Sequence, residues 1–84
     1  MRNQKMIEKN MFEILIFIFN QNRDNRPVNF KDIARQFNIV YRTVANRLNI
    51  LNEKGWIDIQ KNGRSKELII TEKGRMIVKE ILLD

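Results

Sequence analysis

The fold is decided by residues 30–66, which read FKDIARQFNIVYRTVANRLNILNEKGWIDIQKNGRSK. Apolar residues recur at three- and four-residue steps over residues 30–37 and again over residues 40–54, which is the spacing of two helices with one buried face each. Asn29 is a favourable N-cap for the helix at residues 30–37. Gly55 stands where the helix at residues 40–54 can end in a left-handed residue. A short helix, a tight turn and a longer helix form a helix-turn-helix.

A β-hairpin with a basic tip is predicted directly after the second helix. Residues 56–60 and 67–70 are rich in β-forming side chains. Between them, residues 61–66 (KNGRSK) contain Asn62-Gly63, the strongest short-range hairpin signal, and three of these six residues are cationic. A hairpin in this place is the wing of a winged helix-turn-helix.

One further helix is predicted on each side of this unit. Residues 4–22 contain neither Gly nor Pro and carry apolar residues at helical spacing. The polar cluster at residues 20–27, closed by a proline, is expected to end that helix as a loop. Thr71 is expected to cap a final helix over residues 72–83.

The whole chain is expected to form one domain. At 84 residues it is too short for two hydrophobic cores, so residues 1–84 are assigned to a single unit. The predicted fold class is α+β, a winged helix-turn-helix with the order α-α-α-β-β-α. Val28 leaves room for a short strand or bridge before the helix-turn-helix.

The run at residues 30–57 resembles the winged helix-turn-helix transcription regulators of the MarR and ArsR kind. Those families have a similar ladder of Ile-Ala, Thr-Val, Arg-Leu, Leu and Glu-Lys-Gly, and residues 70–75 (ITEKGR) are similar to the opening of their helix after the wing. The likeness covers about residues 29–80, and the compact chain is also similar to winged helices of archaea and their viruses. The resemblance implies a DNA-binding regulator whose terminal helices pair across a two-fold axis. Val40 departs from the pattern, because a Ser or Thr commonly caps the recognition helix there.

Charge and composition favour a polyanionic partner and disfavour catalysis. The formal net charge is +6, and residues 35–66 carry seven basic and two acidic side chains, which is the electrostatic footprint of a phosphate-binding surface. The chain has no Cys and no His, and Ser65 is its only serine. Thiolate, imidazole and serine-triad chemistry and the usual zinc ligands are thereby missing. We therefore expect a binding protein that is not an enzyme and takes no metal or cofactor.

A membrane role is not expected. The most apolar stretch, residues 11–19, contains Glu13 and is far shorter than the roughly 18 to 20 residues that span a bilayer. No small-residue cleavage site follows this stretch. The expected location is the cytoplasm.

The two faces of the helix at residues 40–54 follow from its rotation of about 100° per residue. The apolar residues that fall together and are expected in the core are Val44, Leu48 and Leu51. The residues that are expected on the opposite side are Arg42, Ala45, Asn46 and Asn49. Arginine can form two hydrogen bonds with guanine and asparagine two with adenine, so this face is predicted to read bases in the major groove. Ile50 also points away from the core, where it packs on a loop or marks a second contact surface.

The wing, residues 60–67, is expected to reach the minor groove or the DNA backbone beside the recognition helix. Thr43 and Arg47 lie nearer the edge of that helix and are assigned to phosphates. The complete set of residues predicted to contact DNA is Tyr41, Arg42, Thr43, Ala45, Asn46, Arg47, Asn49, Lys61, Asn62, Arg64, Ser65 and Lys66.

The terminal helices carry more apolar surface than one core needs. Phe12, Ile16 and Phe19 form a second apolar stripe on the helix predicted at residues 4–22, and Ile77 and Ile81 lie on the helix predicted at residues 72–83. The second stripe either widens the core face or contacts a partner subunit, and the partner reading predicts a homodimer with these five residues at its interface. Two recognition helices would then lie about 34 Å apart, so the preferred site would be palindromic double-stranded DNA.

The main alternative is a protein-interaction module, because winged helices also serve as scaffolds in transcription and replication assemblies. Base-reading side chains on the helix at residues 40–54 argue against it. RNA binding is disfavoured because Tyr41 is the only aromatic residue of the basic region that is expected to be exposed.

Overall fold

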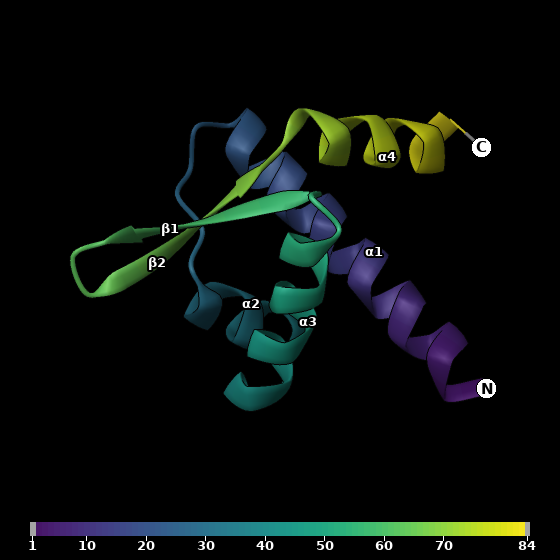
Figure 1. Ribbon diagram of the computed structural model, residues 1–84, viewed down its shortest axis with the longest axis horizontal. Helices are drawn as coiled ribbons and strands as arrows, with labels where there is room; N and C mark the ends of the chain where they lie inside the picture. Colours follow the sequence, from purple (N-terminus) through teal and green to yellow (C-terminus); the bar gives the residue numbers. More distant parts are fainter. Residues whose placement is uncertain (1, 84) are drawn as a thin grey trace.

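A computed structural model describes the backbone of residues 2–83 and the side chains of residues 10–83. Its elements are α1 (Arg2–Arg23), α2 (Phe30–Phe37), α3 (Tyr41–Glu53), β1 (Ile57–Asn62), β2 (Ser65–Ile70) and α4 (Glu72–Leu83). This order confirms the predicted α+β winged helix-turn-helix. In Figure 1, α2 and α3 lie below the hairpin and α4 lies above it, while the hairpin tip projects away from both chain ends.

The predicted ends of the helix-turn-helix are confirmed. The Asn29 side chain accepts a hydrogen bond from the Asp32 amide at 2.9 Å, and the Asp32 carboxylate accepts one from the Asn29 amide at 3.0 Å. These two bonds close a capping box at the start of α2. Asn38 (φ 54°) ends α2 and Gly55 (φ 79°) follows α3, both in the left-handed region. Val40 stands at the N-cap of α3. Its apolar side chain has no hydrogen-bonding group, so it makes no capping hydrogen bond.

The first helix ends one residue beyond the end of the predicted segment, residues 4–22. Residues 20–23, which begin the polar cluster that was expected to end the helix, form the last turn of α1. The Asn22 side chain accepts a hydrogen bond from the Ile70 amide at 2.7 Å and donates one to the Leu68 carbonyl at 3.4 Å. This long-range tie to β2 stabilises a polar turn that its own sequence does not favour.

The hairpin strands are also longer than predicted, and the turn is shorter. β1 and β2 pair antiparallel with Asn62 opposite Ser65, so only Gly63 and Arg64 connect them. Gly63 has φ 67°, and Arg64 has no positive φ. A glycine with positive φ at the first of two loop positions is the pattern of a type II′ turn, which matches the twist of the strands.

The bridge expected near Val28 is present one residue later. Asn29 forms an isolated antiparallel bridge with Glu67, and the Leu68 amide donates to the Val28 carbonyl at 2.8 Å. The residue before α2 is therefore joined directly to the wing.

One core lies between α1, α2, α3, the base of the hairpin and α4. Its fully buried large side chains are Ile14, Leu15, Ile18, Val28, Ile33, Val44, Leu48, Leu51, Ile57, Leu68 and Val78. Burying a side chain of this size contributes about 1.5–3 kcal/mol, so this cluster fixes how α3 and the hairpin are placed on the rest of the chain. Within residues 2–83, no helix combines the length and apolar character that crossing a bilayer requires.

Candidate nucleic-acid interface

The polar face of α3 lies open to solvent. Arg42, Asn46 and Asn49 are exposed, whereas Val44 and Leu48 are fully buried beneath them. Apart from Ala45, both faces of α3 therefore follow the predicted rotation, and three side chains with hydrogen-bonding groups for bases share one open side.

Ala45 does not lie on the exposed face of α3 where it was predicted. The sequence placed it opposite the core, but it is half-buried and packs against the core cluster. The reason is geometric, because Ala45 follows Val44 by one residue and so lies about 100° from it, on the flank of the helix. Thr43 and Arg47 are half-buried, consistent with their predicted place at the edge. Ile50 is 38% exposed and points away from the core, as predicted.

All five predicted wing residues are exposed: Lys61, Asn62, Arg64, Ser65 and Lys66. Lys61 and Lys66 are direct partners across the hairpin, so both side chains lie on one face of it. That face continues the row of Ile57 and Ile59 toward the tip, and Ile57 is in the core. The two lysines therefore lie on the side of the wing that faces the helix-turn-helix.

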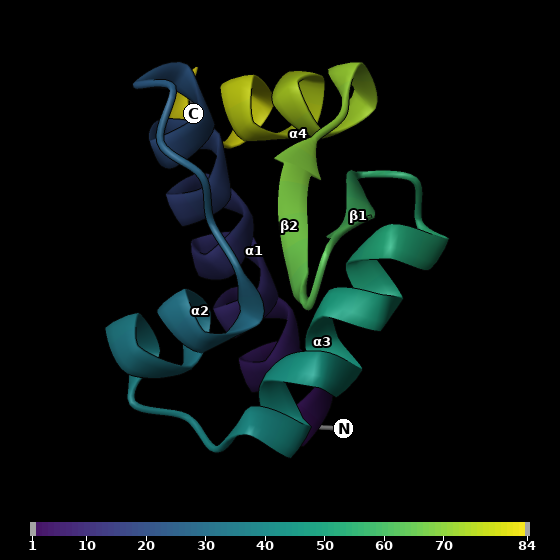
Figure 2. The same cartoon turned by 90° about the vertical axis from the view of Figure 1, so that its left-hand side faces the viewer.

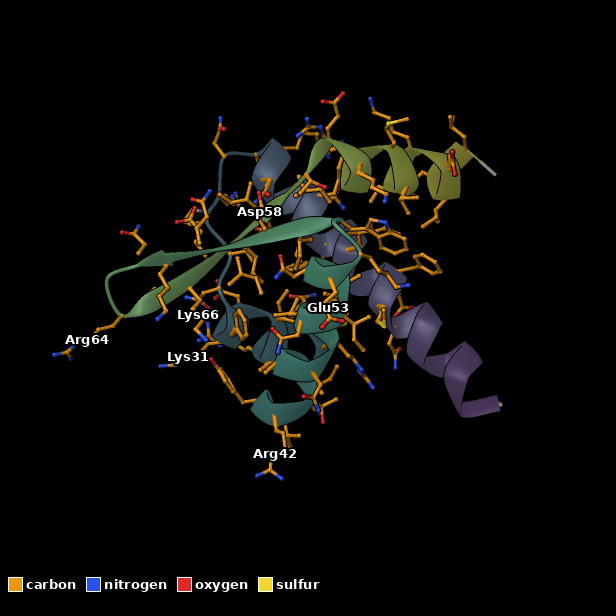
Figure 3. The ribbon with its side chains drawn as sticks, in the orientation of Figure 1. Lys31, Arg42, Glu53, Asp58, Arg64 and Lys66 are labelled. Atoms are coloured by element: carbon orange, nitrogen blue, oxygen red, sulfur yellow. The ribbon has the colours of Figure 1, made fainter. Side chains whose placement is uncertain are left out.

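A cleft of about 230 Å³ lies between the wing and the first residues of α2 and α3. The residues that line it are Asn29, Phe30, Lys31, Tyr41, Arg64, Ser65 and Lys66. Figure 3 shows Lys31 and Lys66 between Arg64 at the wing tip and Arg42 at the start of α3. The two acidic residues of the basic segment, Glu53 and Asp58, lie apart from this group, near the end of α3 and on the upper side of the hairpin.

Lys31 is the member of this basic group that the sequence did not predict. It stands on α2, two residues after the cap, and only the fold brings α2 against the wing. The sequence shows a cation in the first turn of a capped helix. No local sequence feature indicates that this cation lies near residues 64–66. Figure 2 faces the wing tip and shows α2 on one side of it and α3 on the other.

The residues predicted for a dimer interface are partly covered within the chain. Phe12 stacks on Trp56 with ring centroids 5.9 Å apart, and the Arg23 guanidinium lies 5.8 Å from the Phe19 ring centroid. Ile16, Phe19 and Ile77 also pack against the core, and Ile81 is half-buried. The large apolar side chains that α4 exposes most are Met76, Leu82 and Leu83, at 59%, 60% and 86%.

Comparisons with known proteins agree with this fold. The family model described as the DUF6293 C-terminal winged helix domain matches residues 1–80. AF1382 from Archaeoglobus fulgidus is 23% identical with a TM-score of 0.83, over 96% of this chain and 89% of its own. MepR, a transcription regulator of the Staphylococcus aureus multidrug efflux pump MepA, is 23% identical with a TM-score of 0.80 over 94% of this chain.

A complex of Staphylococcus aureus MepR with DNA has a TM-score of 0.74 at 22% identity, over 82% of this chain and 51% of that one. The chain spans 61% of the free MepR structure. A search of curated proteins gave no match. These likenesses establish a shared winged-helix architecture.

Proposed function

The chain belongs to the winged helix family described as the DUF6293 C-terminal winged helix domain, and we propose that it binds double-stranded DNA sequence-specifically as a homodimeric transcription regulator. In this proposal α3 lies in the major groove and the wing contacts the adjacent backbone or minor groove. The chain itself carries out no catalytic step.

The observation that carries the proposal is the exposed polar face of α3, together with the cleft that the start of α3 lines with the wing. Arg42, Asn46 and Asn49 are exposed along α3, and Lys61 and Lys66 lie on the wing face that turns toward the helix-turn-helix. Like charges directly opposite each other destabilise a hairpin, and a bound polyanion offsets that cost. Base-reading groups beside phosphate-binding groups are what a DNA duplex requires.

The similarity to MepR supports the same proposal, because MepR is named as a transcription regulator and has been solved with DNA. Those properties belong to MepR. The open polar face of α3 in this chain is the independent reason to expect them here.

A selection from random duplex DNA, followed by sequencing of the bound pool, tests the proposal. We expect enrichment of a palindromic motif whose half-sites are about one helical turn, or 34 Å, apart. Recovery of no motif, with no binding to any duplex at low salt, would contradict DNA binding and favour the protein-interaction alternative.

Replacing Arg64 or Asn46 by alanine is predicted to weaken DNA binding in two different ways. Arg64→Ala should weaken binding to all duplexes and lower the slope of log K against log salt by about 0.9, since one phosphate contact is lost. Asn46→Ala should weaken the selected site by about tenfold and leave the salt slope unchanged, because it removes a base contact. Fluorescence anisotropy on the selected and a scrambled duplex, at three salt concentrations, measures both effects. Equal binding by the two variants under all conditions would remove the assignment.

The dimer proposal uses α1 and α4; α1 begins and α4 ends far from the wing tip (Figure 1). Leu82 is 60% exposed, so Leu82→Glu should leave the core intact while placing a charge in each half of the interface. We expect the wild type to sediment as a dimer at micromolar concentration and the variant to dissociate about 100-fold more readily. Glu80→Gln, on the same helix, is the control and should remain dimeric. A monomeric wild type at micromolar concentration contradicts this part of the proposal.

Charged substitutions at Phe12 or Phe19 are less suitable tests of the dimer. Phe12 stacks on Trp56 and Phe19 packs against the core, so these variants would also destabilise the fold. A loss of dimer in them would not separate the interface from the subunit.

A further inference from the structure

We propose that the cleft between α2 and the wing binds one phosphate group of the DNA backbone, with Lys31 on one wall and Lys66 and Arg64 on the other. This inference rests on the proposed function and adds a contact on α2 that the recognition helix and the wing tip do not supply. It makes α2 a third DNA-contacting element.

The lining of the cleft has the chemistry of an oxyanion site. Lys31, Arg64 and Lys66 supply positive charge from two elements, and the Tyr41 and Ser65 hydroxyls can donate hydrogen bonds. No carboxylate is among the lining residues. The Asp32 carboxylate is directed to the Asn29 amide in the capping box, so the cations of the cleft keep their charge available for a ligand.

Lys66 lies over the ring of Phe30, and that ring packs in turn against Tyr41. Its Nζ lies 5.5 Å from the centroid of the Phe30 ring, and that ring lies 5.8 Å from the ring of Tyr41. Phe30 is 5% exposed, so it forms a fixed floor. A cation over an aromatic face is attracted to it, which restricts the Lys66 side chain to the region beside Lys31.

The two walls of the cleft are also joined through the backbone. The Asn29–Glu67 bridge and the hydrogen bond from the Leu68 amide to the Val28 carbonyl, at 2.8 Å, fix the start of α2 against β2. The cations are therefore brought together before any ligand arrives, which lowers the entropic cost of binding. A phosphate held by both walls would fix the depth and register of α3 in the groove, since backbone contacts position and base contacts specify.

Lys31→Gln and Arg35→Gln form a matched pair that tests the inference. Both residues are exposed cations on α2, one helical turn apart, but only Lys31 lines the cleft. If the cleft binds a phosphate, Lys31→Gln should weaken binding to the selected duplex by about tenfold and lower the salt slope by about 0.9. Arg35→Gln should change the affinity less than about threefold and leave the slope unchanged, because it removes only a distant charge.

A scan with single neutral methylphosphonate linkages in the same duplex identifies the phosphate. One position in each half-site should weaken binding of the wild type and of Arg35→Gln equally, and should weaken binding of Lys31→Gln by a clearly smaller factor, because only Lys66 and Arg64 remain to bind that phosphate. Equal losses in the two variants, or no position that depends on Lys31, would overturn the inference while leaving sequence-specific binding intact. A wild type that binds no duplex would instead overturn the proposed function.

A titration with inorganic phosphate in the absence of DNA separates a backbone site from a site for the free anion. Nuclear magnetic resonance should detect only millimolar binding at Lys31 and Lys66, because a single phosphate brings none of the other contacts of a duplex. Micromolar binding of inorganic phosphate that persists when the duplex is added would overturn the assignment to DNA.

Discussion

Gly74→Ala is expected to lower the free energy of unfolding by about 3 kcal/mol, although alanine is the better helix former by about 1 kcal/mol. Gly74 is buried in the first turn of α4. A Cβ atom there would overlap the carbonyl oxygen of Trp56 and would lie 3.0 Å from Ile70 Cδ1. The clash with a backbone atom cannot be relieved by rotating a side chain, so the helix would have to move.

The backbone that Gly74 meets is fixed by three hydrogen bonds. The Thr71 amide donates to the Trp56 carbonyl at 3.1 Å, and the Thr71 hydroxyl donates to the Gly55 carbonyl at 2.7 Å. The same hydroxyl accepts from the Gly74 amide at 3.0 Å, which confirms the predicted cap of the last helix. These bonds tie the start of α4 to the segment between α3 and β1, so a displacement of α4 would disturb the whole junction.

Chemical denaturation followed by circular dichroism measures the effect. Lys73→Ala, the exposed neighbouring position, is the control and should stay within about 0.5 kcal/mol of the wild type. A Gly74→Ala variant as stable as the control would show that α4 can shift at no cost.

The elements and their ends could be predicted because their signals are local. Asn29 and Thr71 are caps, Gly55 follows a helix, and the apolar spacing of residues 40–54 repeats within one turn. Each of these signals acts within a few residues along the chain. The order of elements and the buried face of α3 therefore followed without knowledge of the tertiary structure.

What the sequence did not reveal depends on contacts between distant segments. Asn22 lies in a polar cluster that favours a loop, and its side chain bonds to Leu68 and Ile70 of β2, 46 and 48 residues away, which the sequence does not indicate. Gly74 carries no local sign that Trp56 passes beside it. Both positions follow from how the helices and the hairpin pack, which composition and periodicity do not contain.

The candidate site likewise contains residues that could be predicted from local patterns and residues that could not. The exposed face of α3 was predicted from helical geometry, apart from Ala45 on its flank. Lys31 was missed because α2 and the wing are separated by the whole of α3 and β1 in the sequence. Trp56, which covers Phe12, was likewise assigned only to a strand. Contact with DNA by the exposed residues of α3, by the wing or by Lys31 stays a prediction.

Two adjacent residues of α3 provide a way to separate the fold from the proposed function. Leu48 is fully buried and Asn49 is exposed, so one substitution reaches the core and the other reaches the open face. Leu48→Ala should lower the free energy of unfolding by about 3 kcal/mol, because a buried leucine leaves a cavity. A loss of this size is a large part of the roughly 5–10 kcal/mol expected of a small domain.

Asn49→Ala should have the opposite pattern. Its stability should stay within about 0.5 kcal/mol of the wild type, while affinity for the selected duplex should fall about tenfold. The Leu48→Ala protein that remains folded at low temperature should bind the duplex with nearly the wild-type affinity, since its outer face is unchanged. Denaturation curves and anisotropy titrations of both variants at the same temperature measure the two effects. If Asn49→Ala bound every duplex as the wild type does, the open face of α3 would not be the surface that reads bases.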